Sequence, residues 1–147
     1  MDVQGIYGLF PDDVRCVAYL ENLRWNGKPI CPYCTRKNST PLQTGNRHHC
    51  NNCNGTFSVT VQTMFHGTRL PLQKWFLGIA LALTEEKKPT ARTLAGQLEI
   101  NRNSASLLLK RIREAESTEF DLMLQITEKI IGPEYRQKVA FARLHLR

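Results

Sequence analysis

The chain has 147 residues, of which 41% are hydrophobic and 22% are charged, and its formal net charge is +7. A chain of this length forms one domain or two small ones, which excludes most multidomain enzymes, and the composition is typical of a soluble globular protein. The positive charge, with a pI near 9.4, favours a polyanionic partner, nucleic acid above all.

Neither membrane insertion nor secretion is expected. The longest apolar runs, such as residues 79–83, fall far short of the roughly 18 to 20 residues of a membrane helix. Residues 1–5 lack the basic and apolar regions of a signal peptide. We therefore expect a cytoplasmic, nucleoid-associated protein. In that reducing compartment, closely paired cysteines favour metal binding over disulfide formation.

Residues 11–23 are predicted to form the first helix. Pro11 suits a first helical turn, and Asp12 and Asp13 complement the positive end of the helix dipole. The apolar residues at helical spacing predict the buried face: Val14, Val17, Ala18, Leu20 and Leu23. Cys16 lies in this helix, far in sequence from the other cysteines, and is predicted to be a small buried or half-buried hydrophobe.

Residues 26–68 differ in character, because glycines and prolines divide them into short segments. This pattern predicts loops and short strands. Within it, Phe57, Val59 and Val61 alternate with polar residues, which predicts a half-buried strand over residues 57–62.

Two CxxC motifs, residues 31–34 and 50–53, are separated by fifteen residues. Each CxxC turn directs two thiolates to one point, and two such turns complete a closed tetrahedral site for structural zinc. The sequence therefore predicts a zinc ribbon with one structural Zn²⁺, bound by Cys31, Cys34, Cys50 and Cys53. A redox CxxC is the alternative, but no βαβ pattern accompanies it. His48 or His49 could replace a ligand, although four cysteines already satisfy the metal.

The charge distribution is one-sided between Asn22 and Thr84, where the chain contains no Asp or Glu. A surface that faces phosphates explains this pattern, and an ordinary solvated basic surface is the alternative. The candidate phosphate contacts in this stretch are Arg36, Lys37, Arg47, His48, Arg69 and Lys74.

Pro71 is predicted to open a helix that the polar run at residues 85–89 ends. Residues 91–116 then fit the spacing of a helix-turn-helix, in which Asn101 or Asn103 caps the second helix. The expected inner positions are Leu94, Ala95, Leu98, Ile100, Ala105, Leu108 and Ile112. Glu99 departs from the pattern, because glycine often occupies this turn position.

The outward positions of the second helix are predicted DNA contacts: Arg102, Asn103, Ser106, Lys110 and Arg113. A plain helical hairpin with a solvated basic face is the alternative. Leu107 fits neither face, so it contacts a thymine methyl group, a neighbouring helix or another subunit.

The last 31 residues, after Glu116, are predicted to be helical, with another helix starting at Pro133. Their apolar residues at near-helical spacing are Phe120, Met123, Leu124, Ile126, Ile130 and Ile131. This stripe exceeds what a solvated terminal helix needs, so we expect it to help join two chains. Asp121 is predicted to be an exposed helical residue.

Several segments resemble the N-terminal zinc-ribbon region of one group of bacterial insertion-sequence transposases. They are residues 21–25 (ENLRW), CPYC, CNNC, residues 56–60 (TFSVT), residues 111–114 (RIRE) and especially residues 63–76 (TMFHGTRLPLQKWF). The resemblance covers about residues 10–116 and implies binding to transposon-end DNA. Members of this family continue into a carboxylate-dependent nuclease domain, for which the residues after Glu116 show neither strands nor partner acids.

The sequence thus predicts an α+β, mostly helical protein: an N-terminal helix and zinc ribbon (1–70), a helix-turn-helix domain (71–117) and a C-terminal helical extension (118–147). We expect it to bind double-stranded DNA and to regulate transcription without catalysis. Two alternatives stay open, a DNA-targeting subunit of a transposition complex and a zinc-ribbon module that binds the transcription machinery. The corresponding partners are a second copy of the chain, a separate transposase subunit and the transcription machinery.

Overall fold

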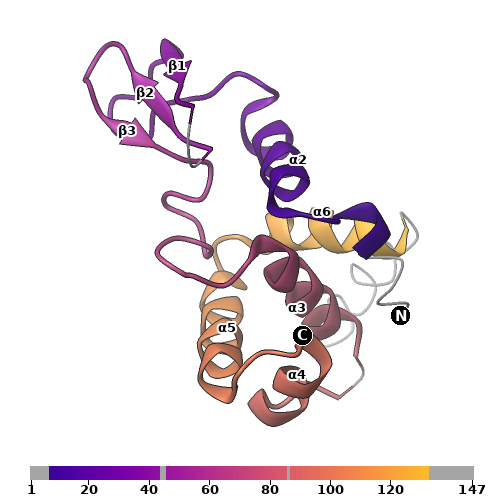
Figure 1. Cartoon of the computed structure of the whole chain (residues 1–147). Coiled ribbons are helices and arrows are strands. Elements are labelled where there is room, and N and C mark those ends of the chain that lie inside the picture. Colours follow the sequence, from indigo (N-terminus) through magenta and orange to yellow (C-terminus); the bar gives the residue numbers. More distant parts are fainter. Residues whose placement is uncertain (1–6, 44–45, 86, 133–147) are drawn as a thin grey trace.

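The computed structural model describes residues 7–43, 46–85 and 87–132, and it has the predicted α+β, mostly helical architecture (Figure 1). The helices are α2 (Asp13–Trp25), α3 (Leu72–Thr84), α4 (Ala91–Leu98), α5 (Arg102–Ala115) and α6 (Phe120–Ile131), and the strands are β1 (Ser39–Pro41), β2 (His48–Cys50) and β3 (Thr56–Phe57). The sheet stands at one end of the molecule, and α3 to α6 form a helical body at the other (Figure 1). No helix within the described ranges combines the length and apolarity that a membrane span requires.

The three strands form an antiparallel sheet in the order β1-β2-β3. Ser39 pairs with Cys50, and His48 of the central strand pairs with Phe57. The side chain of Asn51 donates to Asn38 and Thr40, which ties the end of β2 to β1. The sheet is too small to bury a core of its own, so it needs support from packing against a helix or from a bound metal ion.

Helix α2 begins after Asp12, whose side chain accepts a hydrogen bond from the Arg15 backbone N–H. Its buried residues are Cys16, Leu20 and Trp25. The predicted face was therefore wrong in part: Val14 is 63% exposed, and Ala18 is exposed as well. The prediction that Cys16 is buried is confirmed, and burial raises the pKa of its thiol to about 12.

Helix α3 is the centre of the helical body, and α2, α4, α5 and α6 all pack against it. Its residues from Trp75 to Leu81 are buried without interruption. Gly78 allows a close approach to α5, because a Cβ atom there would lie 2.9 Å from a methyl carbon of Leu108. The predicted start is confirmed, since Pro71 directly precedes the first helical residue.

Helices α4 and α5 are joined by a short turn, and their predicted inner faces are largely confirmed. Leu94, Leu98, Ala105, Leu108 and Ile112 are buried, whereas Ala95 and Ile100 are half-buried against the core. Asn101, not Asn103, caps α5, because its side chain accepts from the Ser104 backbone N–H at 2.8 Å. Glu99 adopts a left-handed conformation with φ of 57°, which explains why glycine suits this position.

Helix α6 packs against α3, and this contact buries Met123, Leu124 and Ile126. The hydroxyl of Tyr19 in α2 also donates to the Gln125 carbonyl at 3.1 Å. The apolar stripe is therefore covered largely by the chain itself. We expected it to join two chains because it exceeds what a solvated helix needs, and packing within the chain accounts for that excess. The helix predicted from Pro133 lies outside the described residues. One hydrophobic cluster extends through all three predicted segments, from Phe10 to Ile126.

The strand expected over residues 57–62 was wrong beyond Phe57, although Val59 is buried. After β3 the backbone turns locally: Val61 N–H donates to Ser58 and Thr63 N–H to Thr60. These turns satisfy the polar backbone groups within the segment, so they do not extend the sheet. We call residues 58–71, which lead from the sheet to α3, the connector.

Side chains from the helices hold the connector at several points. Arg24 of α2 donates to the Val59 carbonyl at 2.8 Å. The Met64 backbone N–H donates to the Glu119 carboxylate at 3.1 Å. Arg111 of α5 donates to the Met64 carbonyl, and also to the carbonyl of His66. Hydrogen bonds from α2 and from the helical body therefore fix the connector, and with it the position of the zinc-binding end.

Candidate metal centre and nucleic-acid interface

The two CxxC loops share one backbone pattern, which we call a knuckle: residues 31–36 and residues 50–55. In each, the N–H of the first cysteine donates to the carbonyl five residues later, and its own carbonyl accepts from the N–H four residues later. The residue that donates this second N–H is Thr35 in one knuckle and Asn54 in the other, and both have a φ of 64°. The same local fold thus occurs twice and presents two sulfur atoms each time.

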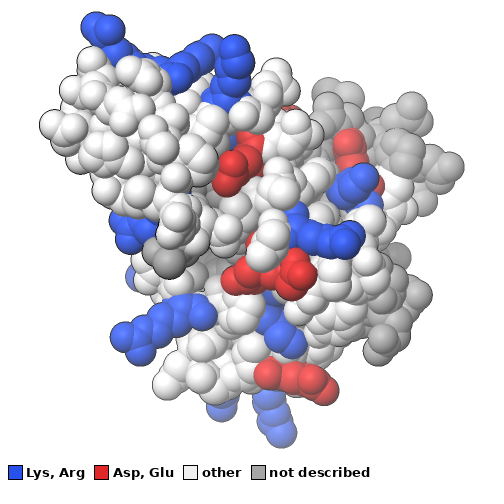
Figure 2. Space-filling view, turned by 45° about the horizontal axis from the view of Figure 1, so that its top comes forward, with Lys and Arg blue, Asp and Glu red and all other residues white. Residues whose placement is uncertain are grey.

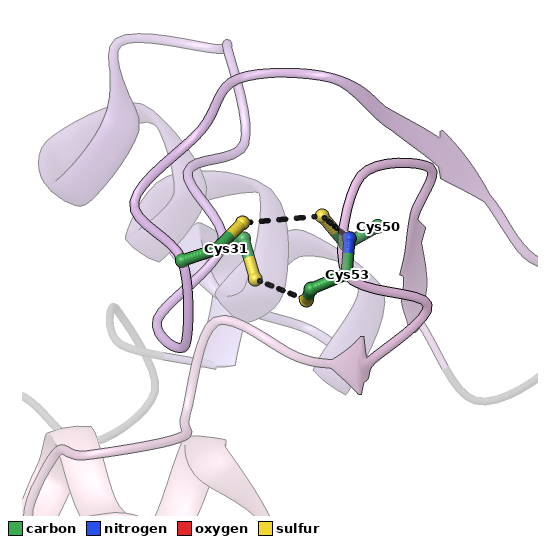
Figure 3. A group of neighbouring side chains, drawn as sticks. Cys31, Cys50 and Cys53 are labelled. Atoms are coloured by element: carbon green, nitrogen blue, oxygen red, sulfur yellow. Dashed lines mark hydrogen bonds between the residues drawn. The ribbon is translucent and has the colours of Figure 1, made fainter.

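The two knuckles face each other and bring four sulfur atoms together (Figure 3). Cys31 Sγ lies 3.6 Å from Cys53 Sγ, and Cys34 Sγ lies 3.5 Å from Cys50 Sγ. All four ligand atoms lie within 4.8 Å of one another. Tetrahedral Zn²⁺ with Zn–S bonds of about 2.3 Å requires sulfur atoms about 3.8 Å apart, so the residues fit one structural zinc ion.

The thiols of this cluster do not lose their protons equally. The backbone N–H of Arg36 is the main cause that lowers the pKa of Cys34 to about 6. At Cys53 the backbone N–H of Gly55 also lowers the pKa, but desolvation and the other three sulfur atoms outweigh it and raise the pKa to about 11. A bound divalent cation would remove this difference in protonation, because its charge stabilises all four thiolates together.

An aromatic cluster lies beside the metal centre and joins the sheet to α2. The rings of His48 and Phe57 stack with centroids 5.6 Å apart, and the Trp25 ring meets both edge-on at 5.8 and 5.7 Å. His48 is only 8% exposed, and its Nε2 lies 3.4 Å from a carboxylate oxygen of Glu21. The structure therefore places the His48 ring in the interior beside a carboxylate, unlike the exposed basic candidates.

The other basic candidates on the sheet side are at the surface. Arg36, Lys37 and Arg47 are exposed, and so is Arg69 in the connector. Figure 2 shows Lys and Arg side chains along the upper edge of this end of the molecule, whereas the Asp and Glu side chains lie away from that edge. Lys74 differs, because it is half-buried and its ammonium group donates to the Tyr7 hydroxyl at 3.1 Å.

The outward residues of α5 are all exposed, as helical spacing predicts: Arg102, Asn103, Ser106, Lys110 and Arg113. Asn101 caps the helix, which leaves the Asn103 side chain without that role. Arg111 differs from its neighbours because the connector carbonyls occupy its guanidinium group.

Sequence reasoning assigned no role to Arg24, Arg111 or Glu119, which hold the connector. Both arginines lie in segments that carry the resemblance to transposases, so a signal for their importance was present. Their partners could not be read from it, because the bonded carbonyls of Val59 and Met64 lie 35 and 47 residues away.

Four cysteines on two knuckles, joined by a small antiparallel sheet, define a zinc ribbon. Residues 11–56 match the family model of the transposase zinc-ribbon domain, so this part of the chain is similar to that domain. Comparisons with curated proteins and with solved structures find no match.

Proposed function

We propose that the protein binds double-stranded DNA through two surfaces, the basic edge of the zinc ribbon and the outer face of α5. The observation that carries this proposal is the set of exposed polar and basic side chains on α5, which no other part of the described chain covers: Arg102, Asn103, Ser106, Lys110 and Arg113. The basic edge of the zinc ribbon adds three exposed cations, Arg36, Lys37 and Arg47.

In this proposal α4 and α5 act as a helix-turn-helix, and α5 enters the major groove. Residues at the N-terminal end of a recognition helix reach base edges, which assigns that role to Arg102, Asn103 and Ser106. Arginine recognises guanine and asparagine recognises adenine through paired hydrogen bonds. Lys110 and Arg113 lie further along the helix and contact phosphates instead.

The ribbon residues supply affinity without sequence preference. The backbone of Arg36 and Arg47 is hydrogen-bonded, because the Arg36 carbonyl accepts from the Cys31 N–H and the Arg47 carbonyl accepts from the Leu42 N–H. Because phosphate contacts release counterions, each such residue makes binding more sensitive to salt.

The biological role that we propose is regulation of transcription without catalysis, by occupation of DNA sites. In the described ranges, the only group of three or more side chains suited to hold a metal ion is the four-cysteine cluster, and this cluster fits a structural zinc ion. A DNA-targeting subunit of a transposition complex has the same DNA-binding requirements. It differs in needing a nuclease from another chain.

The test is selection of preferred duplexes from a random library, followed by salt titration of binding to the best duplex. Replacing Arg102, Asn103 and Ser106 by alanine should abolish the selected preference, at about 1–3 kcal/mol for each paired base contact. Replacing Arg36, Lys37 and Arg47 should weaken all duplexes equally and reduce the salt slope by about 0.9 per lost contact. Arg15→Ala on α2 and Lys129→Ala on α6 are matched controls, because both side chains are exposed.

Binding that does not depend on salt, or no enrichment of any duplex, would contradict the proposal. That result would favour the zinc ribbon as a module that binds a protein of the transcription machinery.

A further inference from the structure

A groove of about 430 Å³ lies between the connector and α5. One wall is formed by residues 67–71 and Trp75, and the other by Ser104, Leu107 and Leu108. The groove is mainly apolar, but the cationic residue Arg69 is part of its connector wall. It therefore combines an apolar contact surface with a cation.

Leu107 is the unusual residue of this groove. It is 43% exposed, although α5 buries its other leucines, Leu108 and Leu109. On the helix surface its neighbours are three or four residues away, and they include Asn103 and Lys110, which belong to the proposed DNA-binding face. No helix in the described part of the chain covers Leu107, so it is not explained as a core residue.

The connector wall is held in a defined position beside α5. Arg111, one turn along the helix from Leu107, donates to the carbonyls of Met64 and His66. The indole N–H of Trp75 donates to the Thr68 hydroxyl at 3.0 Å. These bonds anchor the backbone on both sides of Gly67, and they keep Arg69 next to the exposed face of α5.

We propose that Leu107 and Arg69 together recognise a thymine and its flanking phosphate in the DNA. Leu107 makes an apolar contact with the 5-methyl group, which the major groove exposes only at thymine. Arg69 binds a phosphate across the groove. Charge complementarity supports DNA as the occupant, because Arg69 is the only charged residue among those that line the groove. This inference rests on the proposed DNA binding and adds a residue that determines specificity.

The experiment uses the full chain with zinc and the best duplex from the selection. Each thymine is replaced in turn by uracil, which removes only the 5-methyl group. At one thymine the wild-type protein should lose about threefold to fivefold in affinity, as expected for one buried methyl group. Leu107→Ala should bind the thymine and uracil duplexes equally, and Leu107→Met should keep the discrimination.

Arg69→Ala should weaken binding to every duplex and reduce the salt slope by about 0.9, whereas Arg15→Ala should change neither. Circular dichroism and zinc content check that the variants fold. The proposal is overturned if no thymine responds, or if Leu107→Ala still discriminates thymine from uracil. Salt-dependent, sequence-selective binding in the same experiment would leave the broader DNA-binding function standing, and its absence would contradict both.

Discussion

The zinc ribbon and the helical body are stabilised by different physical means. In the ribbon, the knuckles and three short strands place few large apolar side chains in the interior, and the cysteines take the central position. In the helical body, α3 is buried from Trp75 to Leu81 and the other helices pack around it. We therefore expect the ribbon to depend on its metal ion and the helical body on apolar packing, so that the two regions unfold under different conditions.

Removing zinc should give the largest effect and should affect only one of the two regions. Cys34→Ser, or a chelator, should unfold residues 31–57 and leave α3 to α6 folded, because structural zinc contributes roughly 10–16 kcal/mol to the folding of small zinc peptides. Hydrogen exchange followed by mass spectrometry distinguishes the two regions, and elemental analysis measures the zinc.

Two variants serve as controls for the zinc experiment. Cys16→Ser makes the same thiol-to-hydroxyl change outside the metal centre, so it should keep one zinc per chain. Phe76→Ala should do the reverse of Cys34→Ser: it should cost about 3–5 kcal/mol in the helical core and leave the zinc bound. If His48–Cys50 stayed protected from exchange after chelation, the ribbon would not depend on zinc for its fold.

The bonds that join the two regions should have an intermediate effect. Arg111→Ala removes the donor to the Met64 and His66 carbonyls and should cost about 1.5–3 kcal/mol, as expected for hydrogen bonds from a charged group. Exchange should increase at the connector, without loss of zinc or of α5. Lys110→Ala is the matched control, because this neighbouring side chain is exposed. Equal exchange in both variants would show that Arg111 does not hold the connector.

How much the sequence could predict depends on the range of each interaction. The zinc ligands were predictable because each CxxC motif forms within one turn, and α4 and α5 because their caps and apolar spacing are local. The face of α2 was predicted only in part: Cys16 and Leu20 are buried as expected, but the packing of α2 against α3 leaves Val14 exposed. The burial of His48 likewise depends on Trp25 and Phe57, which meet it only in the folded chain. The face of α2 and the burial of His48 thus both depend on contacts between residues that are distant in sequence.

The smallest effect concerns two asparagines at the start of α5 that the sequence did not distinguish. Asn101→Ala should cost about 1 kcal/mol, because the side chain caps the helix by accepting the Ser104 N–H. Asn103→Ala should leave the free energy of unfolding nearly unchanged, since this exposed side chain is not the cap.

For DNA binding, Asn103→Ala should have the larger effect of the two variants if α5 is the recognition helix. Asn103→Ala should change the selected sequence, whereas Asn101→Ala should keep the sequence and lower only the stability. Urea denaturation and duplex selection on the same two variants measure both properties. A loss of sequence preference in Asn101→Ala alone would place the base contacts on the turn instead of the helix.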